Sequence, residues 1–318
     1  MLFAAGDGLH GRELWATDAT DTWLVKDVWP GPDSSHPNSL TAIGDRVYFV
    51  ADDGSHGTEV WVTDGTSAGT ELLDDTWPGP DGIAQGLFVP VGGAGDIVFR
   101  SGDGTVGEEL YVHDVSAGTT TLIEDLNPGT GDSYPSSPTP LSDGRVIFSA
   151  RVDGSGSEPY ITDGTTITSL GDLAPGATSA LPNNFVELEP GVILFEAWNA
   201  DGNEPWVTDG TPGGTMLLQD INPGAGSGLP TDYVIFNGDA WFAATDGVAG
   251  YELWTTDGTP GGTTLVHDVE PGAASSDPRD LFVHGDHLYF NAIVGGSGRE
   301  LWRTDGTPGG FELSLIHI

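Results

Sequence analysis

Paired carboxylates recur along the chain, each a glutamate followed five residues later by an aspartate. The pairs are Glu13/Asp18, Glu59/Asp64, Glu109/Asp114, Glu158/Asp163, Glu204/Asp209, Glu252/Asp257 and Glu300/Asp305. Two carboxyl groups held together can hydrolyse a glycosidic bond, one as acid and the other as base or nucleophile. An enzyme needs one such site, so sevenfold repetition assigns these pairs to the scaffold, with each aspartate bonded to its own turn. We therefore expect no catalytic residue among them.

The loops before these glutamates offer a second kind of chemistry, the binding of calcium. Segments such as Asp52-Asp53-Gly54 and Asp201-Gly202-Asn203 resemble a loose calcium-binding loop, because they supply several oxygen ligands. They lack the alternating aspartates and the terminal glutamate that make such a loop specific. Calcium is thus an open alternative to plain turns. We assign no metal ligand and expect no other cofactor.

The glutamates also measure a repeat, with steps of 46, 50, 49, 46, 48 and 48 residues. One repeat, residues 39–79, contains four runs of four to six residues that are separated by Gly, Asp and Pro clusters. Such runs are typical of short strands joined by tight turns, and Asp-Gly between two of them indicates a hairpin. Four antiparallel strands per repeat predict an all-β fold, a β-propeller of seven blades, with six blades as the alternative. We expect one propeller domain over residues 1–318.

Two aromatic positions per repeat supply the expected core between blades. Burying one Trp or Tyr removes about 150–250 Å² from water, which makes such positions dominant in packing. The first set is Trp15, Trp61, Tyr111, Tyr160, Trp206, Trp254 and Trp302. The second set is Phe3, Phe49, Phe99, Phe148, Phe195, Phe242 and Phe290.

The stretch 252–263, with the sequence ELWTTDGTPGGT, resembles the bacterial repeat family named ELWxxDGT after its own consensus. The resemblance extends over the whole chain through its seven copies. It implies a secreted or surface-anchored repeat protein and carries no implication of an enzymatic activity. The hairpins that begin at Asp18, Asp114 and Asp163 depart from the motif, so we expect them to be irregular.

The composition excludes several partners. The formal net charge is −39 and Lys26 is the sole lysine, so nucleic acid and anionic membranes would be repelled. No apolar run is long enough to span a bilayer. The chain has no cysteine, which excludes disulfides and thiolate metal sites. We expect a monomer, and because Met1 falls in the middle of a repeat, we interpret the chain as a fragment of a longer protein.

Positions at which the repeats differ are the best candidates for binding. Trp29 and Trp77 stand where other repeats have Asn, Ala or Glu, and Tyr134 and Trp198 add further aromatics to the same type of loop. With Asp33 and Asp81 beside them, they could stack on a sugar ring and hydrogen-bond its hydroxyls. The alternative is that each Trp packs on its own turn or on the next blade. Arg100 and Glu196 are further departures, which we interpret as lining a channel.

These observations favour a non-catalytic extracellular or cell-surface module that binds a carbohydrate or a surface protein. One alternative is a carbohydrate-active propeller enzyme with a single acidic, calcium-assisted site. Another is a purely structural spacer without a ligand.

Overall fold

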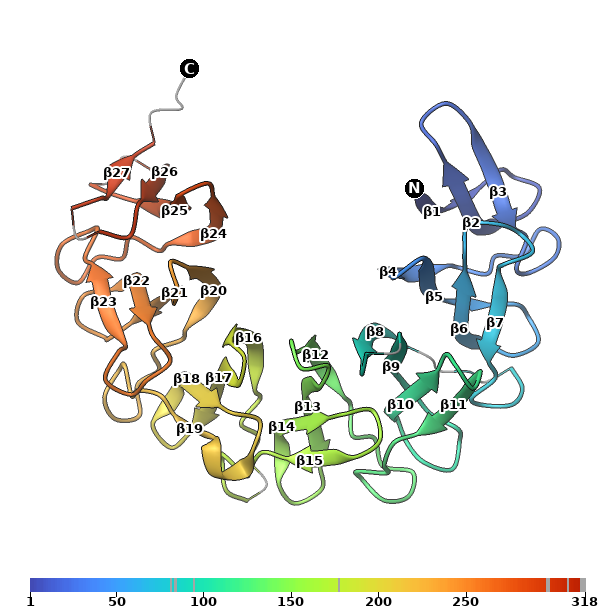
Figure 1. Ribbon diagram of the computed structural model, residues 1–318, viewed down its shortest axis with the longest axis horizontal. Helices are drawn as coiled ribbons and strands as arrows, with labels where there is room; N and C mark the ends of the chain where they lie inside the picture. The colour runs from blue at the N-terminus through green and yellow to red at the C-terminus, as the bar shows by residue number, and fades with distance from the viewer. Residues whose placement is uncertain are drawn as a thin grey trace. The chain divides into compact units, whose positions relative to one another are not determined.

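A computed structural model describes residues 1–314 except 81, 83, 84, 94, 177, 296, 297 and 308. In this part of the chain the strands form seven antiparallel sheets, one of three strands and six of four (Figure 1). The single helical element among these residues is a 3₁₀ turn, η1 (Pro212–Gly214). We call the sheets blades one to seven in chain order. The expected all-β fold with seven blades is confirmed.

In each blade the strands are hydrogen-bonded in chain order. Blade one contains β1 (Leu2–Gly6), β2 (Arg12–Thr17) and β3 (Thr22–Lys26). Blade two contains β4 (Asn38–Ile43), β5 (Arg46–Asp52), β6 (Thr58–Thr63) and β7 (Glu71–Asp74). Blade three contains β8 (Gln85–Val91), β9 (Asp96–Ser101), β10 (Glu109–Asp114) and β11 (Thr119–Leu122). Blade four contains β12 (Ser136–Pro140), β13 (Val146–Val152), β14 (Gly156–Thr162) and β15 (Ile167–Ser169).

The remaining blades repeat the same order. Blade five contains β16 (Asn183–Glu189), β17 (Val192–Asn199), β18 (Gly202–Thr208) and β19 (Met216–Leu217). Blade six contains β20 (Thr231–Phe236), β21 (Asp239–Thr245), β22 (Tyr251–Thr256) and β23 (Thr264–His267). Blade seven contains β24 (Arg279–His284), β25 (His287–Ile293), β26 (Arg299–Thr304) and β27 (Glu312–Leu313).

The chain divides into two compact units, each of which stacks its blades in chain order. Unit one is Met1–Asp153 with Ile161–Thr168, and unit two is Gly154–Tyr160 with Ser169–Ile318. In unit one, β4 contacts β8 and β8 contacts β12; in unit two, β16 contacts β20 and β20 contacts β24. The first strands of consecutive blades therefore lie beside one another, as in a propeller.

The core lies between blades, where both aromatic sets were expected. Phe49 and Trp61 are opposite residues on β5 and β6, with ring centroids 6.5 Å apart. They pack against Leu14 and Val25 of blade one. The same cross-strand pair recurs as Phe99/Tyr111 and Phe195/Trp206. Of the seven phenylalanines in the second aromatic set, all except Phe3 are completely buried.

Aspartates close the hairpins between the third and fourth strands through their own turns. Asp64 accepts hydrogen bonds from the backbone amide and hydroxyl of Thr66, at 2.8 and 2.7 Å. Only Gly65 of the Asp-Gly pair has a positive φ, 89°, so the turn is not the type I′ geometry that suggested the hairpin. The hairpin is longer, and the hydroxyls of Thr63 and Thr70 close its base at 2.7 Å. No helix of the described residues is long and apolar enough to cross a membrane.

Candidate functional site

Six of the seven repeated glutamates, all except Glu300, are buried scaffold residues. Glu252 is fully buried, and its carboxylate accepts from the amides of Val269 and Ser276, at 3.0 and 2.7 Å, and from the Ser276 hydroxyl at 2.6 Å. Glu13 makes the equivalent bonds to Val28 and Ser35. Each carboxylate therefore anchors the connection from its own blade to the next, which supports the assignment of these residues to the scaffold.

The aspartates of the pairs are hydrogen-bonded within their own turns. Hydrogen bonds from Asp21 and Thr20 lower the pKa of Asp18 to about 2. The side chain and amide of Thr165 lower the pKa of Asp163 to about 2 in the same way. A carboxylate with such a pKa is a poor general acid or base near neutral pH.

The side chains of the loops that resemble calcium sites form hydrogen bonds within those loops. Asp53 accepts from the amides of Ser55 and His56 and from the His56 ring, at 2.8, 2.9 and 2.7 Å. The Asp201 amide donates to Asn199 at 2.8 Å. Within the described ranges, no group of three or more His, Cys, Asp or Glu residues could hold a metal ion.

Trp29 and Trp77 lie at junctions between blades. A Cβ placed on Gly54 would come within 2.5 Å of the Trp29 indole, and one on Gly104 within 2.8 Å of the Trp77 indole. Each indole thus covers a glycine in a loop of the following blade. Both side chains are half-buried, and their contacts fit the packing alternative, while ligand binding by either stays a prediction.

The other aromatic candidates are exposed. Tyr134 is 48% exposed and hydrogen-bonds Asp132, while Trp198 is 41% exposed on β17. Asp33 is exposed, with its backbone carbonyl against Gly11. Asp81 lies outside the described residues. A binding role for these residues stays a prediction.

Arg100 and Glu196 each find partners in their own blade. The Arg100 guanidinium forms an ion pair with Glu108, with Nε 3.1 Å from Oε2. Glu196 accepts from Asn184 at 2.7 Å and from Asn203 at 2.9 Å. Both lie on the second strand of their blade, opposite the first residue of the first strand, and a channel-lining role for them stays a prediction.

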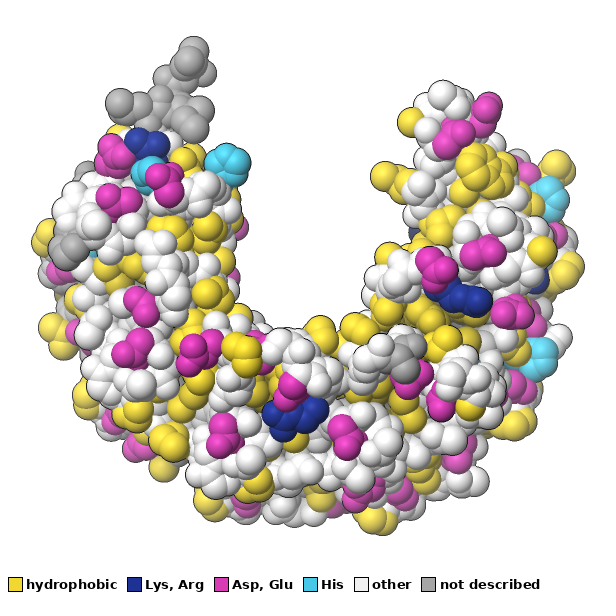
Figure 2. Space-filling view, in the orientation of Figure 1, with side chains coloured by type: hydrophobic (Ala, Val, Ile, Leu, Met, Phe, Trp, Pro, Cys, Tyr) yellow, Lys and Arg dark blue, Asp and Glu magenta, His cyan; other side chains and the backbone are white. Residues whose placement is uncertain are grey.

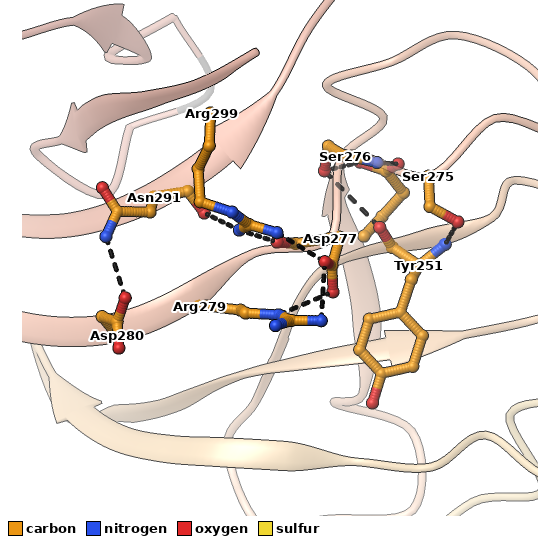
Figure 3. A network of polar contacts seen from close by, with 9 residues as sticks. Tyr251, Ser275, Ser276, Asp277, Arg279, Asp280, Asn291 and Arg299 are labelled. Carbon is orange, nitrogen blue, oxygen red and sulfur yellow. Dashed lines mark hydrogen bonds and ion pairs between the residues drawn. The ribbon is translucent and has the colours of Figure 1, made fainter.

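A further departure from the repeat, a cluster of charged side chains, lies in unit two at the start of β24. Asp277 binds two arginines: Arg279 at 2.9 Å and Arg299 at 2.5 Å, both to Oδ2 (Figure 3). Arg299 also donates to the Asp277 carbonyl at 2.6 Å, which fixes its guanidinium. The Asp277 amide donates to the Tyr251 carbonyl at 3.0 Å, so this cluster is held to β22.

The cluster lies on a bulge at the start of β24. Asp277 and Asp280 have positive φ values of 47° and 55°, and the register of β24 against β25 shifts between Arg279 and Phe282. Aspartate tolerates this left-handed conformation better than most residues. Asn291 on β25 donates to Asp280 at 2.9 Å, which holds this end of the strand in place. The same register shift occurs in the first strands of blades two to six, so the bulge belongs to the repeat and only the charged residues on it are particular to blade seven.

A cavity of about 510 Å³ adjoins the cluster and is lined by Leu229, Thr231, Asp232, Tyr251, Asp277, Pro278 and Arg279. The Tyr251 hydroxyl donates to the Leu229 carbonyl. Burial raises the pKa of Tyr251, so the hydroxyl stays a neutral donor. The cavity combines an aromatic ring, an apolar side chain and charged groups of both signs. Such a lining suits a polar ligand that also has an apolar face.

The sequence interpretation did not identify these residues. Arg279 and Arg299 are two of only nine basic residues, and that scarcity was the available signal. Acidic side chains are scattered over the visible surface of both units, with few basic ones among them (Figure 2). A pair of arginines on one aspartate is therefore unusual in this chain.

No protein-family model matches the chain, and no curated protein matches it. Among solved structures, the chain is similar to one from an analysis of two prolyl endopeptidases, with a TM-score of 0.52 and 12% identity. That match covers 86% of this chain and 42% of the other. TolB from Acinetobacter baumannii matches with a TM-score of 0.41 and 13% identity over 87% of this chain and 65% of its own. At such identities the first similarity supports the fold alone.

Proposed function

We propose that this chain is a non-catalytic binding module whose ligand is a carbohydrate, held in the cavity beside Tyr251 and Arg279. The observation that carries the proposal is the combination of a tyrosine ring with an arginine that Asp277 holds in place. Sugars present an apolar ring face and a rim of hydroxyl groups. A cavity that offers an aromatic surface and both donors and acceptors matches that chemistry.

The polar groups of the cavity can both donate hydrogen bonds to a sugar hydroxyl and accept them from it. Guanidinium nitrogens of Arg279 donate, and the carboxylates of Asp277 and Asp232 accept. The Arg279 side chain is 62% exposed, so it can reach a ligand without leaving Asp277. Charged partners roughly double the strength of a hydrogen bond, which favours specific recognition at this position.

Two observations support a binding role over a catalytic one. The repeated glutamates accept hydrogen bonds from backbone amides, and hydrogen bonds within the turns keep the repeated aspartates ionised. The glutamates of six repeats are buried away from any ligand, and the aspartates stay ionised, so neither set is placed to exchange a proton with a bound ligand. The resemblance to the ELWxxDGT repeat family and the acidic surface favour an extracellular or cell-surface setting.

A glycan array tests the proposal with three proteins: the unmodified chain, Arg279→Ala, and Arg151→Ala as a control for the loss of one positive charge. Arg151 pairs only loosely with Asp153, at 3.6 Å on the open surface. We expect the unmodified chain and Arg151→Ala to bind the same glycans and Arg279→Ala to lose them. Equal binding by all three would contradict the assigned cavity. Cleavage of a bound glycan would contradict the non-catalytic role, and the absence of any binding would favour a structural spacer.

A further inference from the structure

Six of the seven repeats carry a further acidic residue at the junction between blades, in the motif Asp-x-x-Pro-Gly. One carboxylate oxygen of this aspartate accepts from the amide four residues later. The distance is 3.2 Å for Asp27 to Gly31 and for Asp125 to Gly129, and 3.3 Å for Asp220 to Gly224. This oxygen closes the turn and explains why the aspartate recurs.

The other oxygen of the same carboxylate is buried and unsatisfied. In five blades the Oδ1 atom has no hydrogen-bond partner within the described part of the chain; the residues are Asp27, Asp75, Asp125, Asp220 and Asp268. Burying a polar atom without a partner is unfavourable, and more so for a charged group. Repetition at equivalent positions indicates a common feature of the blades rather than a local accident.

In four of these blades the aspartate lies within electrostatic reach of the fully buried glutamate. Burial raises the pKa of Glu204 to about 7, and the charge of Asp220 adds to that effect. Asp75 acts on Glu59, Asp125 on Glu109 and Asp268 on Glu252 in the same direction. Each aspartate thus places a like charge near a buried carboxylate, which is unfavourable unless a positive charge or a proton joins them.

Blade three shows this arrangement most clearly. Oε1 of Glu109, Oδ1 of Asp125 and the hydroxyl of Tyr111 are all buried, and none has a partner among the residues described. Glu109 is completely buried and Tyr111 is 5% exposed. Both carboxylates lie within electrostatic reach of the Tyr111 hydroxyl, as does Asp103. The Glu109 carboxylate also accepts from the amide of Leu126, the residue after Asp125, at 3.3 Å, so the unpartnered oxygens belong to one region of blade three.

Basic side chains do not neutralise these pairs. The ion pairs formed by the chain's arginines, as far as the described residues go, involve none of the five aspartates or their glutamates. His10 and His56 lie within electrostatic reach of the pairs in blades one and two, but each ring is bonded to its own loop aspartate. Blade three has no such histidine, because Val106 stands at the equivalent position.

We propose that the buried Glu–Asp pair at the blade junction binds a divalent cation of the calcium type, with Glu109 and Asp125 of blade three as the clearest site. Carboxylate oxygens are ligands that calcium prefers, and backbone carbonyls or water complete its coordination. Two carboxylates are a small donor set, which places the affinity in the range of about 10⁻⁴–10⁻³ M typical of extracellular calcium modules. This site differs from the Asp52-Asp53-Gly54 loop and is independent of the proposed ligand cavity.

Terbium luminescence tests this site, because Tb³⁺ substitutes for calcium and is excited through a nearby aromatic ring such as that of Tyr111. The test variant is Glu109→Gln with Asp125→Asn. The matched control, Glu71→Gln with Asp45→Asn, removes the same charge from exposed side chains of blade two. We expect emission that Ca²⁺ displaces, one binding equivalent fewer in the test variant, and no loss in the control. An unchanged number of equivalents in the test variant would overturn the proposal.

Folding is checked by far-ultraviolet circular dichroism and thermal melting. If the double variant does not fold, Asp125→Asn alone serves, because its amide oxygen can still accept from Gly129. Melting of the unmodified chain in millimolar CaCl₂ is then compared with NaCl at matched ionic strength. A larger rise in Tm with calcium than with sodium supports a specific site, and a rise that Asp125→Asn reduces assigns it to blade three. Equal rises with both salts would show screening alone and refute the site.

Discussion

The carboxylate of Glu204 accepts a hydrogen bond from the amide of Gly228 at 2.6 Å, across the connection that leads from blade five into blade six. A second bond, from the Ile221 amide at 2.9 Å, holds the beginning of the same connection. One side chain thus fixes both ends of a loop that has no sheet of its own. This geometry explains why the glutamate recurs in every repeat without any catalytic role.

Replacing Glu204 with alanine should destabilise unit two markedly. The change leaves two buried amides without acceptors, at about 1–3 kcal/mol each. Urea denaturation measures the free energy of unfolding, with Glu189→Ala as the control because that glutamate is exposed. Similar midpoints for the two variants would mean that the buried bonds contribute little.

Trp29→Ala should reduce stability and leave ligand binding intact. The indole covers Gly54 of the next blade, so truncation opens a gap at that junction. A half-buried tryptophan should cost about 1–3 kcal/mol on removal. Thermal melting and the glycan array measure the two effects on the same sample. Lost binding with an unchanged Tm would contradict this prediction and assign Trp29 to ligand binding.

Stability should decrease as the pH rises through the titration of Glu196. Burial raises the pKa of Glu196 in the folded chain, against the opposing hydrogen bonds from Asn203 and Asn184. The folded state therefore binds this proton more tightly than the unfolded state, and the free energy of unfolding falls between the ordinary and the raised pKa. Urea midpoints across this window should fall less in Glu196→Gln than in the unmodified chain. Parallel pH profiles would exclude Glu196 as the source.

The sequence predicted the blades because their determinants are local and repeated. Phe49 and Trp61 lie on adjacent strands of one hairpin, and their spacing alone indicates a cross-strand pair. The packing of Trp29 on Gly54 depends on how two blades stack, so its sequence neighbourhood left both interpretations open. Arg279 and Arg299 meet at Asp277 beside a strand bulge that also occurs in the first strands of blades two to six. The bulge belongs to the repeat, whereas the side chains on it differ between repeats, so their meeting could not be predicted from the periodicity.

The most direct test of the proposed function is a calorimetric titration with the glycan that binds most strongly on the array. The unmodified chain, Arg279→Ala and Trp77→Ala are compared at the same ionic strength. We predict that Arg279→Ala weakens binding about tenfold or more, as expected for the loss of a charged hydrogen bond of at least about 1.4 kcal/mol. Trp77→Ala should bind like the unmodified chain, because its indole packs over Gly104. Unchanged affinity in Arg279→Ala together with lost affinity in Trp77→Ala would contradict the proposed cavity.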